Sequence, residues 1–143
     1  MARFNHGVVF DHVQEGDTLP ECRITMHGER YFAYNKLVNE INPLHFDREY
    51  AGKLGYRDIV VAGVYTFSFI PKMIENWVGE SGRIRSIDIR FQSPVYIEDT
   101  IIHTAYVKEK YSGDDARYIK CQVSAHNTEG HCVTSALVSV SFS

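Results

Sequence analysis

Residues 39–47, Asn-Glu-Ile-Asn-Pro-Leu-His-Phe-Asp, bring together two side-chain types that exchange protons near neutral pH. Glu40 supplies a carboxylate and His45 an imidazole, a pair that suits general acid–base chemistry. Pro43 fixes its own backbone angle and pushes Asn42 toward extended geometry, so the loop can hold both side chains toward one point. Because catalytic groups are commonly carried on loops that a rigid scaffold positions, Glu40 and His45 are the candidate catalytic residues.

The same segment also has a plainer interpretation. In it, the loop is solvated, Asn42-Pro43 makes an ordinary turn and His45 caps a neighbouring element. A carboxylate and an imidazole in one loop do not decide between the two interpretations, since structural ion pairs also bring such groups together. On these residues alone, both stay open.

Short elements flank this loop on both sides. Residues 21–26 predict a short strand, and residues 28–38 predict a short helix. After the loop, Asp47 is the expected N-cap of a second short helix over residues 48–54, which Gly55 ends. The candidate residues are therefore expected between two short helices.

Residues 63–78 predict the main helix of the chain. The apolar side chains of its first half fall on nearly every side, which is typical of a buried helix; they are Val64, Tyr65, Phe67, Phe69 and Ile70. Pro71 lies inside this run and predicts a kink or a local break, because its ring clashes with the preceding turn and it has no N–H to donate.

The second half of the chain predicts strands. Residues 112–115 and 127–130 have the composition of turns, and they separate runs rich in β-branched and alternating side chains, over residues 83–91, 100–108, 118–125 and 132–142. Long antiparallel strands around one buried helix describe an α+β fold in which the sheet wraps the helix. No linker divides residues 1–143, so a single domain is expected.

Composition limits the classes of function. The net charge of −3 gives no sign of the basic face that a nucleic-acid-binding protein usually has. The three cysteines are odd in number and have no metal-binding spacing, which favours a reducing, cytoplasmic compartment and no metal. No apolar run is long enough to span a membrane, and no signal peptide is visible. No cofactor is expected.

The loop and two later segments resemble the MaoC-like dehydratases, also called type 2 enoyl-CoA hydratases. That family carries Ser-Gly-Asp-x-Asn-Pro-Leu-His followed by an acidic helical stretch, and the resemblance extends from about Gly28 to the C-terminus. The segments that carry it here are residues 38–51, around Asn-Pro-Leu-His, residues 55–66, which lead into the main helix, and residues 87–100, with their Ser-Pro-Val break.

The resemblance implies a hot-dog fold and (R)-specific hydration of trans-2-enoyl thioesters, or the reverse dehydration of 3-hydroxyacyl thioesters. It implies that Glu40 and His45 hold and deprotonate a water, and that the N–H of Gly63 binds the thioester oxygen as negative charge develops there. It also implies that Ser68 supports the site and that Asn42 orients the loop. Plainer interpretations are a close helix–sheet contact for Gly63 and, slightly favoured, a Ser68 hydroxyl bonded to its own helix.

The sequence departs from the family pattern at three positions. The family aspartate is Glu40 here, which adds one methylene of reach, the glycine before it is Asn39, and the histidine before Gly63 is Ala62. The change at Glu40 leaves open an altered or absent activity, with this chain acting as the non-catalytic subunit of a hetero-oligomeric dehydratase. The changes at Asn39 and Ala62 affect the expected shape of the substrate pocket.

A hot-dog acyl-CoA thioesterase is the other alternative. It would use a carboxylate on the central helix, and residues 63–69 contain none. The expected substrate is carried on coenzyme A or on an acyl carrier protein, and a homodimer or higher homo-oligomer is expected because a single sheet around one helix leaves an unpaired edge.

Overall fold

A five-stranded antiparallel sheet forms one side of the molecule in the computed structural model, which describes residues 7–143. The strands lie in the order β1-β3-β4-β5-β2, so that β1 and β2 are its edges. Their bounds are Cys22–Thr25 for β1, Gly82–Phe91 for β2, Thr100–Ser112 for β3, Arg117–His126 for β4 and Cys132–Phe142 for β5. The strands predicted in the second half of the sequence are all present.

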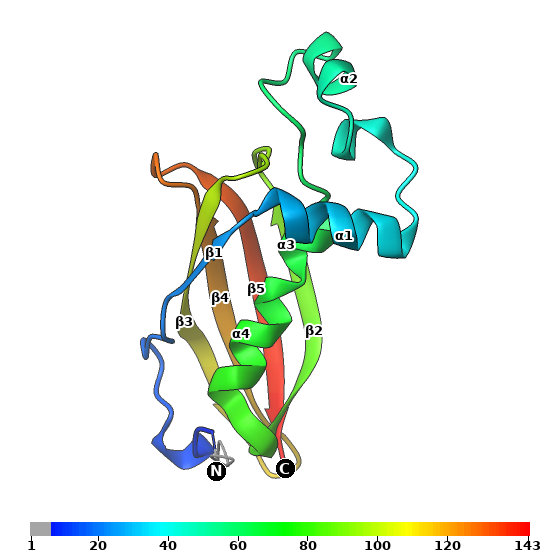
Figure 1. Cartoon of the computed structure of the whole chain (residues 1–143). Coiled ribbons are helices and arrows are strands. Elements are labelled where there is room, and N and C mark those ends of the chain that lie inside the picture. Colours follow the sequence, from blue (N-terminus) through cyan, green and yellow to red (C-terminus); the bar gives the residue numbers. More distant parts are fainter. Residues whose placement is uncertain (1–6) are drawn as a thin grey trace, which may run out of the picture.

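The four α-helices of residues 7–143 lie on one side of the sheet or beyond its end (Figure 1). Their bounds are Gly28–Val38 for α1, Arg48–Lys53 for α2, Gly63–Phe67 for α3 and Phe69–Val78 for α4. Helix α4 runs along the curved sheet, α1 crosses near α3 at one end, and α2 stands away from the sheet (Figure 1). A helix wrapped by a curved sheet is the hot-dog arrangement that the resemblance to the family implied.

The main core lies between α4 and the sheet. Ile70 and Ile74 of α4 are buried at helical spacing, and Val138 and Val140 of β5 face the same cluster at a spacing of two. Each fully buried aliphatic side chain contributes about 1.5–3 kcal/mol relative to an exposed one. Ile70 is buried as predicted for the first half of the central helix. The prediction is wrong for Val64 in α3, which is 66% exposed in the single chain.

The break in the central helix lies at Ser68, between α3 and α4. Pro71 has no N–H to bond the carbonyl of Phe67, and its ring crowds that carbonyl, so the regular bonding pattern is interrupted one turn before the proline. The break predicted from Pro71 is confirmed, and the sequence rule also accounts for its position.

Strand β2 keeps its apolar face by means of a bulge. Its register with β5 shifts between Ile84 and Ser86, and one extra residue there places Ile84 on the same face as Ile87. Without it, strict alternation would point these two side chains to opposite faces. In the described part of the chain, the other edge of β2 pairs with no strand.

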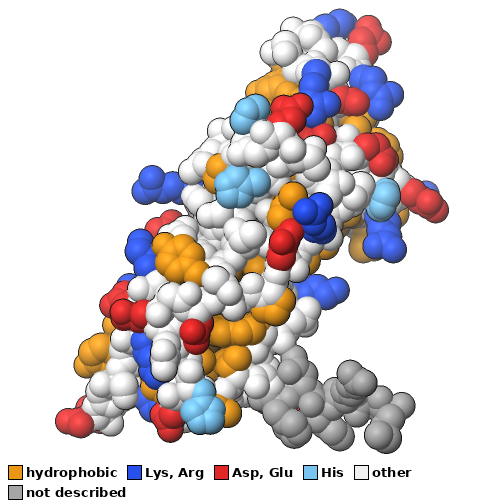
Figure 2. Space-filling model, turned by 90° about the vertical axis from the view of Figure 1, so that its left-hand side faces the viewer, with side chains coloured by type: hydrophobic (Ala, Val, Ile, Leu, Met, Phe, Trp, Pro, Cys, Tyr) orange, Lys and Arg blue, Asp and Glu red, His pale blue; other side chains and the backbone are white. Residues whose placement is uncertain are grey.

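Charged side chains of both signs are scattered over the face that carries β1 and β3, with apolar areas between them (Figure 2). Among residues 7–143, none of the helices has the length and apolar composition of a membrane span. Over the same residues, no group of three or more His, Cys, Asp or Glu side chains gathers where it could hold a metal ion.

Candidate active site

His45 ends a short 3-10 turn, Pro43–His45, that Asn42 caps. The Asn42 backbone is extended, as expected for a residue before proline, and its side-chain oxygen accepts a hydrogen bond from the N–H of Leu44 at 3.1 Å. Asn42 therefore shapes the turn that presents His45, and the loop-orienting role that the resemblance implied stays a prediction.

The ring of His45 is fixed by a backbone carbonyl from a distant segment. Its Nδ1 lies 2.9 Å from the carbonyl oxygen of Val60, and because a carbonyl only accepts, Nδ1 carries the proton. In the neutral imidazole, Nε2 then has a free lone pair, which is the form that takes a proton from water. The N–H of Val60 also donates to the carbonyl of Leu44 at 3.3 Å, so the two segments are bonded twice.

Glu40 is held by its own loop. It follows Asn39, whose left-handed backbone (φ 56°) ends α1, a conformation that asparagine tolerates better than most residues. One carboxylate oxygen, Oε1, accepts a hydrogen bond from the N–H of Asn42 at 2.9 Å. The carboxylate is thus bonded to the backbone two residues further along its own loop.

A cleft of about 360 Å³ opens beside His45 and the start of α3. It is mainly apolar, with His45 and a few hydroxyl and amide side chains as its polar members; the lining residues are His45, Val60, Val61, Gly63, Thr66, Phe91, Gln92, Ser93, Pro94, Val95 and Thr134. Of the residues singled out from the sequence, His45 and Gly63 lie together in this lining. Glu40, Asn42 and Ser68 are outside the lining that residues 7–143 provide.

Gly63 is the first residue of α3, so no carbonyl within the helix is available to its N–H. A Cβ at this position would lie 3.0 Å from the ring of Phe91, so glycine also allows the helix to approach the end of β2. The close-contact interpretation of Gly63 is confirmed, and the same residue borders the cleft with an N–H available to a ligand.

The hydroxyl of Ser68 donates to the carbonyl oxygen of Tyr65 in the preceding turn at 2.6 Å. This is the hydrogen bond back to its own helix that the sequence slightly favoured. Ser68 also marks the break between α3 and α4. In this structure the Ser68 side chain stabilises the break between α3 and α4.

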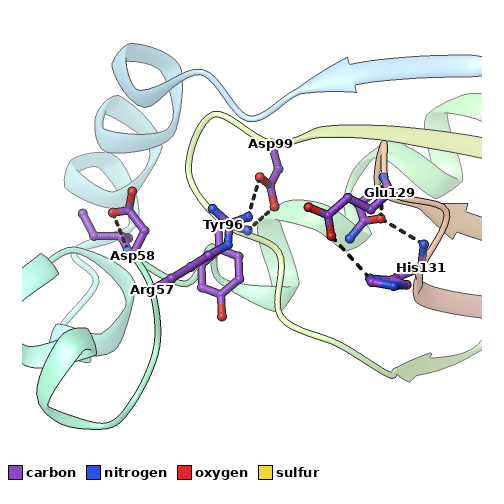
Figure 3. Close-up of polar contacts among 8 residues, drawn as sticks. Arg57, Asp58, Tyr96, Asp99, Glu129 and His131 are labelled. Atoms are coloured by element: carbon purple, nitrogen blue, oxygen red, sulfur yellow. Dashed lines mark hydrogen bonds and ion pairs between the residues drawn. The ribbon is translucent and has the colours of Figure 1, made fainter.

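The segment that carries Val60 is tied to the turn before β3 (Figure 3). The guanidinium of Arg57 lies over the Tyr96 ring, 4.0 Å from its centroid, and donates to Asp99 at 3.0 Å. Asp99 also accepts from the N–H of Tyr96 at 3.0 Å, and Val60 forms a β-bridge with Tyr96. The carbonyl that orients His45 is thus held by the turn that leads into β3.

Asp58 ties the same segment to α2. Burial raises the pKa of Asp58, but hydrogen bonds from Arg48 and from the N–H of Ile59 outweigh it and hold the pKa below the ordinary value. The Arg48 bond is 2.8 Å long and the Ile59 bond 2.7 Å. A charged Asp58 therefore helps to fix the chain just before Val60.

Two residues of α1 contact this site and were missed in the sequence. Tyr31 and Asn35 both donate to the carbonyl oxygen of His45, at 2.8 Å and 3.1 Å. Both side chains are buried, whereas Leu37 on the same helix is 85% exposed. A tyrosine and an asparagine four residues apart share one helix face, and that spacing was the only available signal.

Comparison with known proteins places this arrangement in a family. The family model described as MaoC like domain matches residues 12–129. A mitochondrial 3-hydroxyacyl-(acyl-carrier-protein) dehydratase of Arabidopsis thaliana is 37% identical over 87 residues, 61% of this chain and 51% of that protein. The 3-oxo-4,17-pregnadiene-20-carboxyl-CoA hydratase beta subunit of Mycobacterium tuberculosis is 27% identical over 124 residues, 85% of this chain and 92% of that subunit.

A solved structure, the (R)-hydratase from A. caviae involved in PHA biosynthesis, is similar with a TM-score of 0.80 at 16% identity, covering 92% of this chain and 98% of that one. At that identity the likeness concerns the fold, and it confirms the hot-dog architecture. The chain spans about half the length of the plant dehydratases it matches. Because the family model covers most of its length, this chain belongs to the MaoC-like domain family.

Proposed function

We propose that this chain adds water to the double bond of a trans-2-enoyl thioester with (R) specificity, or catalyses the reverse dehydration of a 3-hydroxyacyl thioester. The observation that carries the proposal is the pairing, in one apolar cleft, of the His45 imidazole with the N–H of Gly63. Family membership and the dehydratase and hydratase names of the relatives support it. Coenzyme A or an acyl carrier protein supplies the thioester.

In the proposed reaction, Nε2 of His45 takes a proton from water while the water oxygen bonds to the β-carbon. The electron pair of the double bond moves toward the thioester carbonyl, whose oxygen gains negative charge. The N–H of Gly63 donates to that oxygen, and a preorganised donor of this kind lowers the barrier for charge development. The imidazolium then returns a proton to the α-carbon, so that water is added and no other reagent is consumed.

Glu40 is the proposed partner of His45, and its geometry favours a secondary role in the reaction. One oxygen already accepts from Asn42, which leaves Oε2 to accept a hydrogen bond from the reacting water. A carboxylate in this place orients the water and favours the imidazolium that forms. Its position outside the cleft lining predicts a smaller contribution than that of His45.

We also propose that two copies of this single-domain chain assemble. Val64 is 66% exposed and Phe91, at the cleft, is 55% exposed, both large apolar side chains for a surface. Beside them, β2 presents a free sheet edge in the described chain, which favours pairing with a second copy. Sedimentation equilibrium tests this, and a monomer at micromolar concentration would contradict it.

The cytoplasmic location expected from the sequence stays a prediction. It rests on the three cysteines without paired or metal-binding spacing. The plant relatives are named mitochondrial and a mouse relative is named peroxisomal, so the compartment differs among related proteins. Fractionation of cells that express the native protein at its own level tests the prediction.

Hydration of crotonyl-CoA, followed by loss of the enoyl absorbance, tests the reaction. Measurable turnover that depends on His45 supports the proposal, and chiral analysis of the product should give the (R)-3-hydroxyacyl thioester. The same assay with acyl-carrier-protein thioesters separates the two carriers. Absence of turnover with all enoyl thioesters would contradict the proposal and favour the non-catalytic subunit, while release of free thiol from saturated acyl-CoA would favour a thioesterase.

A further inference from the structure

The hydroxyl of Tyr31 lies where three segments of the chain meet. Tyr31 belongs to α1, its O–H donates to the carbonyl of His45 at 2.8 Å, and its oxygen accepts from the N–H of Ala62 at 3.0 Å. One hydroxyl therefore joins the loop that carries the imidazole to the residue immediately before Gly63. A tyrosine hydroxyl can do this because it has one hydrogen to donate and lone pairs to accept.

Asn35 reinforces the same contact from the next turn of α1. Its Nδ2 donates to the carbonyl of His45 at 3.1 Å. Residues four apart on a helix lie on one face, so both side chains reach the same carbonyl. The buried face of α1 at this end is thus polar and directed at the His45 loop.

These bonds close a ring around the site. From His45 the ring passes through Tyr31 to Ala62, then along the chain to Val60, whose carbonyl accepts from Nδ1 of His45 at 2.9 Å. The closed ring fixes both the backbone and the side chain of His45 relative to Ala62. Because Gly63 follows Ala62 directly, its N–H is fixed relative to the imidazole as well.

We propose that Tyr31, supported by Asn35, is a positioning residue that sets the spacing between the His45 imidazole and the Gly63 N–H. This inference rests on the proposed hydratase function. Acid–base and oxyanion groups work together only when both are aligned with the same bound substrate, and a displacement of about 1 Å costs about a hundredfold in rate. Tyr31 acts through His45 and Ala62 and needs no contact with substrate.

The surroundings of Tyr31 leave it little freedom to adopt another role. Its ring is fully buried and packs edge-on against Tyr65, with 5.1 Å between the ring centroids. Burial is the largest influence on the Tyr31 pKa and raises it, outweighing the hydrogen bonds from Asn35 and Ala62 that lower it. The hydroxyl thus keeps its proton across the physiological range and remains a donor to His45.

Tyr31→Phe removes this hydroxyl and keeps the buried ring, and Tyr34→Phe is the matched control. Tyr34 lies on the same helix and also packs on Tyr65, with centroids 5.0 Å apart, but its hydroxyl bonds neither His45 nor Ala62 in the described structure. In crotonyl-CoA hydration, Tyr31→Phe should lower kcat about ten- to a hundredfold, with KM changed less than about threefold. Tyr34→Phe should leave both constants near the wild-type values.

A second variant covers the case in which Tyr31→Phe does not fold. Asn35→Ala removes the other donor to the same carbonyl and should lower kcat several-fold, again with little change in KM. A kcat as high as that of the wild type in a folded Tyr31→Phe or Asn35→Ala protein overturns the proposal. An equal loss in Tyr34→Phe also overturns it, since the loss would then not depend on the bond to His45.

Hydrogen exchange at the Ala62 amide separates this inference from the proposed function. In Tyr31→Phe the Ala62 N–H loses its acceptor and should exchange at least about tenfold faster, whereas Tyr34→Phe should leave it protected. If the wild type hydrates no enoyl thioester, the function proposal fails while this measurement still reports whether Tyr31 joins the two segments. Unchanged Ala62 exchange in a folded Tyr31→Phe protein overturns the positioning role whatever the activity.

Discussion

The two ends of the loop between α1 and α2 are held in different ways. At the Glu40 end, the carboxylate is bonded by Asn42, two residues away in the sequence. At the His45 end, the carbonyl is bonded by Tyr31 and Asn35 from α1, and the ring by Val60 from the segment before α3. The Glu40 end is therefore held locally, and the His45 end is held by distant parts of the fold.

This difference bears on how the pair divides the work. A group that several distant elements fix can serve as the precise partner of a bound substrate, because its position does not follow local loop motion. A group held only by its own loop can adjust its position at low cost. We therefore expect activity to depend more on His45 than on Glu40.

His45→Ala should have the largest effect. It removes the proton acceptor, and loss of a general acid–base group lowers kcat about 10²- to 10⁴-fold. Steady-state hydration of crotonyl-CoA measures this, with thermal unfolding as a check that the variant is folded. A fall of less than about fivefold in a folded variant would remove His45 from the proposed chemistry.

Glu40→Gln should have a smaller effect, about ten- to a hundredfold on kcat. Glutamine keeps the size and the hydrogen bond to Asn42 but removes the charge that favours the imidazolium. Glu40→Asp keeps the charge on a side chain one methylene shorter, so it separates the charge from the reach of the carboxylate. If Glu40→Gln loses as much as His45→Ala, the two ends contribute equally and the contrast is wrong.

Asp58→Asn tests the far anchor of His45 and should act on stability. It weakens the bonds from Arg48 and Ile59 and should lower the free energy of unfolding by about 0.5–1 kcal/mol at neutral pH. Because the folded-state pKa of Asp58 lies below its ordinary value of 3.8, the charged group stabilises the fold above that pH, and this contribution fades as pH falls below it.

Urea unfolding of the wild type and Asp58→Asn from pH 7 to pH 3 measures this effect. The gap between the two proteins should be constant down to about pH 4 and then narrow. A gap that widens toward acid would show that Asp58 is not a stabilising charge, and the proposed anchoring of the segment before Val60 would lose one of its supports.

Ser68→Ala should have the smallest effect, a change in kcat of less than about twofold, as for substitutions away from a site. The serine hydroxyl is bonded to Tyr65 within the helix break. A kcat loss above about tenfold, with unchanged thermal stability, would return Ser68 to the site and show that the break rearranges when substrate binds.

Much of the fold could be predicted because local rules agreed with the final structure. Asp47 caps α2 as expected, with its side chain accepting from the N–H of Tyr50, and β5 has the predicted bounds Cys132–Phe142. Strand β3 runs to Ser112, past the predicted end at residue 108, because its last residues pair with β4 and Tyr111 stacks on Tyr118. That extension depends on a partner strand, which local composition does not reveal.

The chemical groups of the candidate site could be predicted from the sequence, but the residues that hold them in place could not. The resemblance to the family indicated His45 and Gly63, which share the cleft, and the rule for residues before proline predicted the extended Asn42. Neither indicated Val60, because Val60 contributes a backbone carbonyl and any residue type carries one. On α1, the apolar Leu37 is exposed and Tyr31 is buried, because burial depends on which helix face meets the loop.

The polar contact from α1 has a consequence for comparing members of the family. Tyr31 and Asn35 precede the Asn-Pro-Leu-His motif in the sequence, yet both donate hydrogen bonds to the backbone carbonyl of His45. If Tyr31 and Asn35 position His45 as proposed, two proteins with the same motif will differ in turnover when their first helices differ at these two positions. Transplanting the motif alone into another hot-dog scaffold should give a slow enzyme, and adding the Tyr-x-x-x-Asn pair upstream should restore speed.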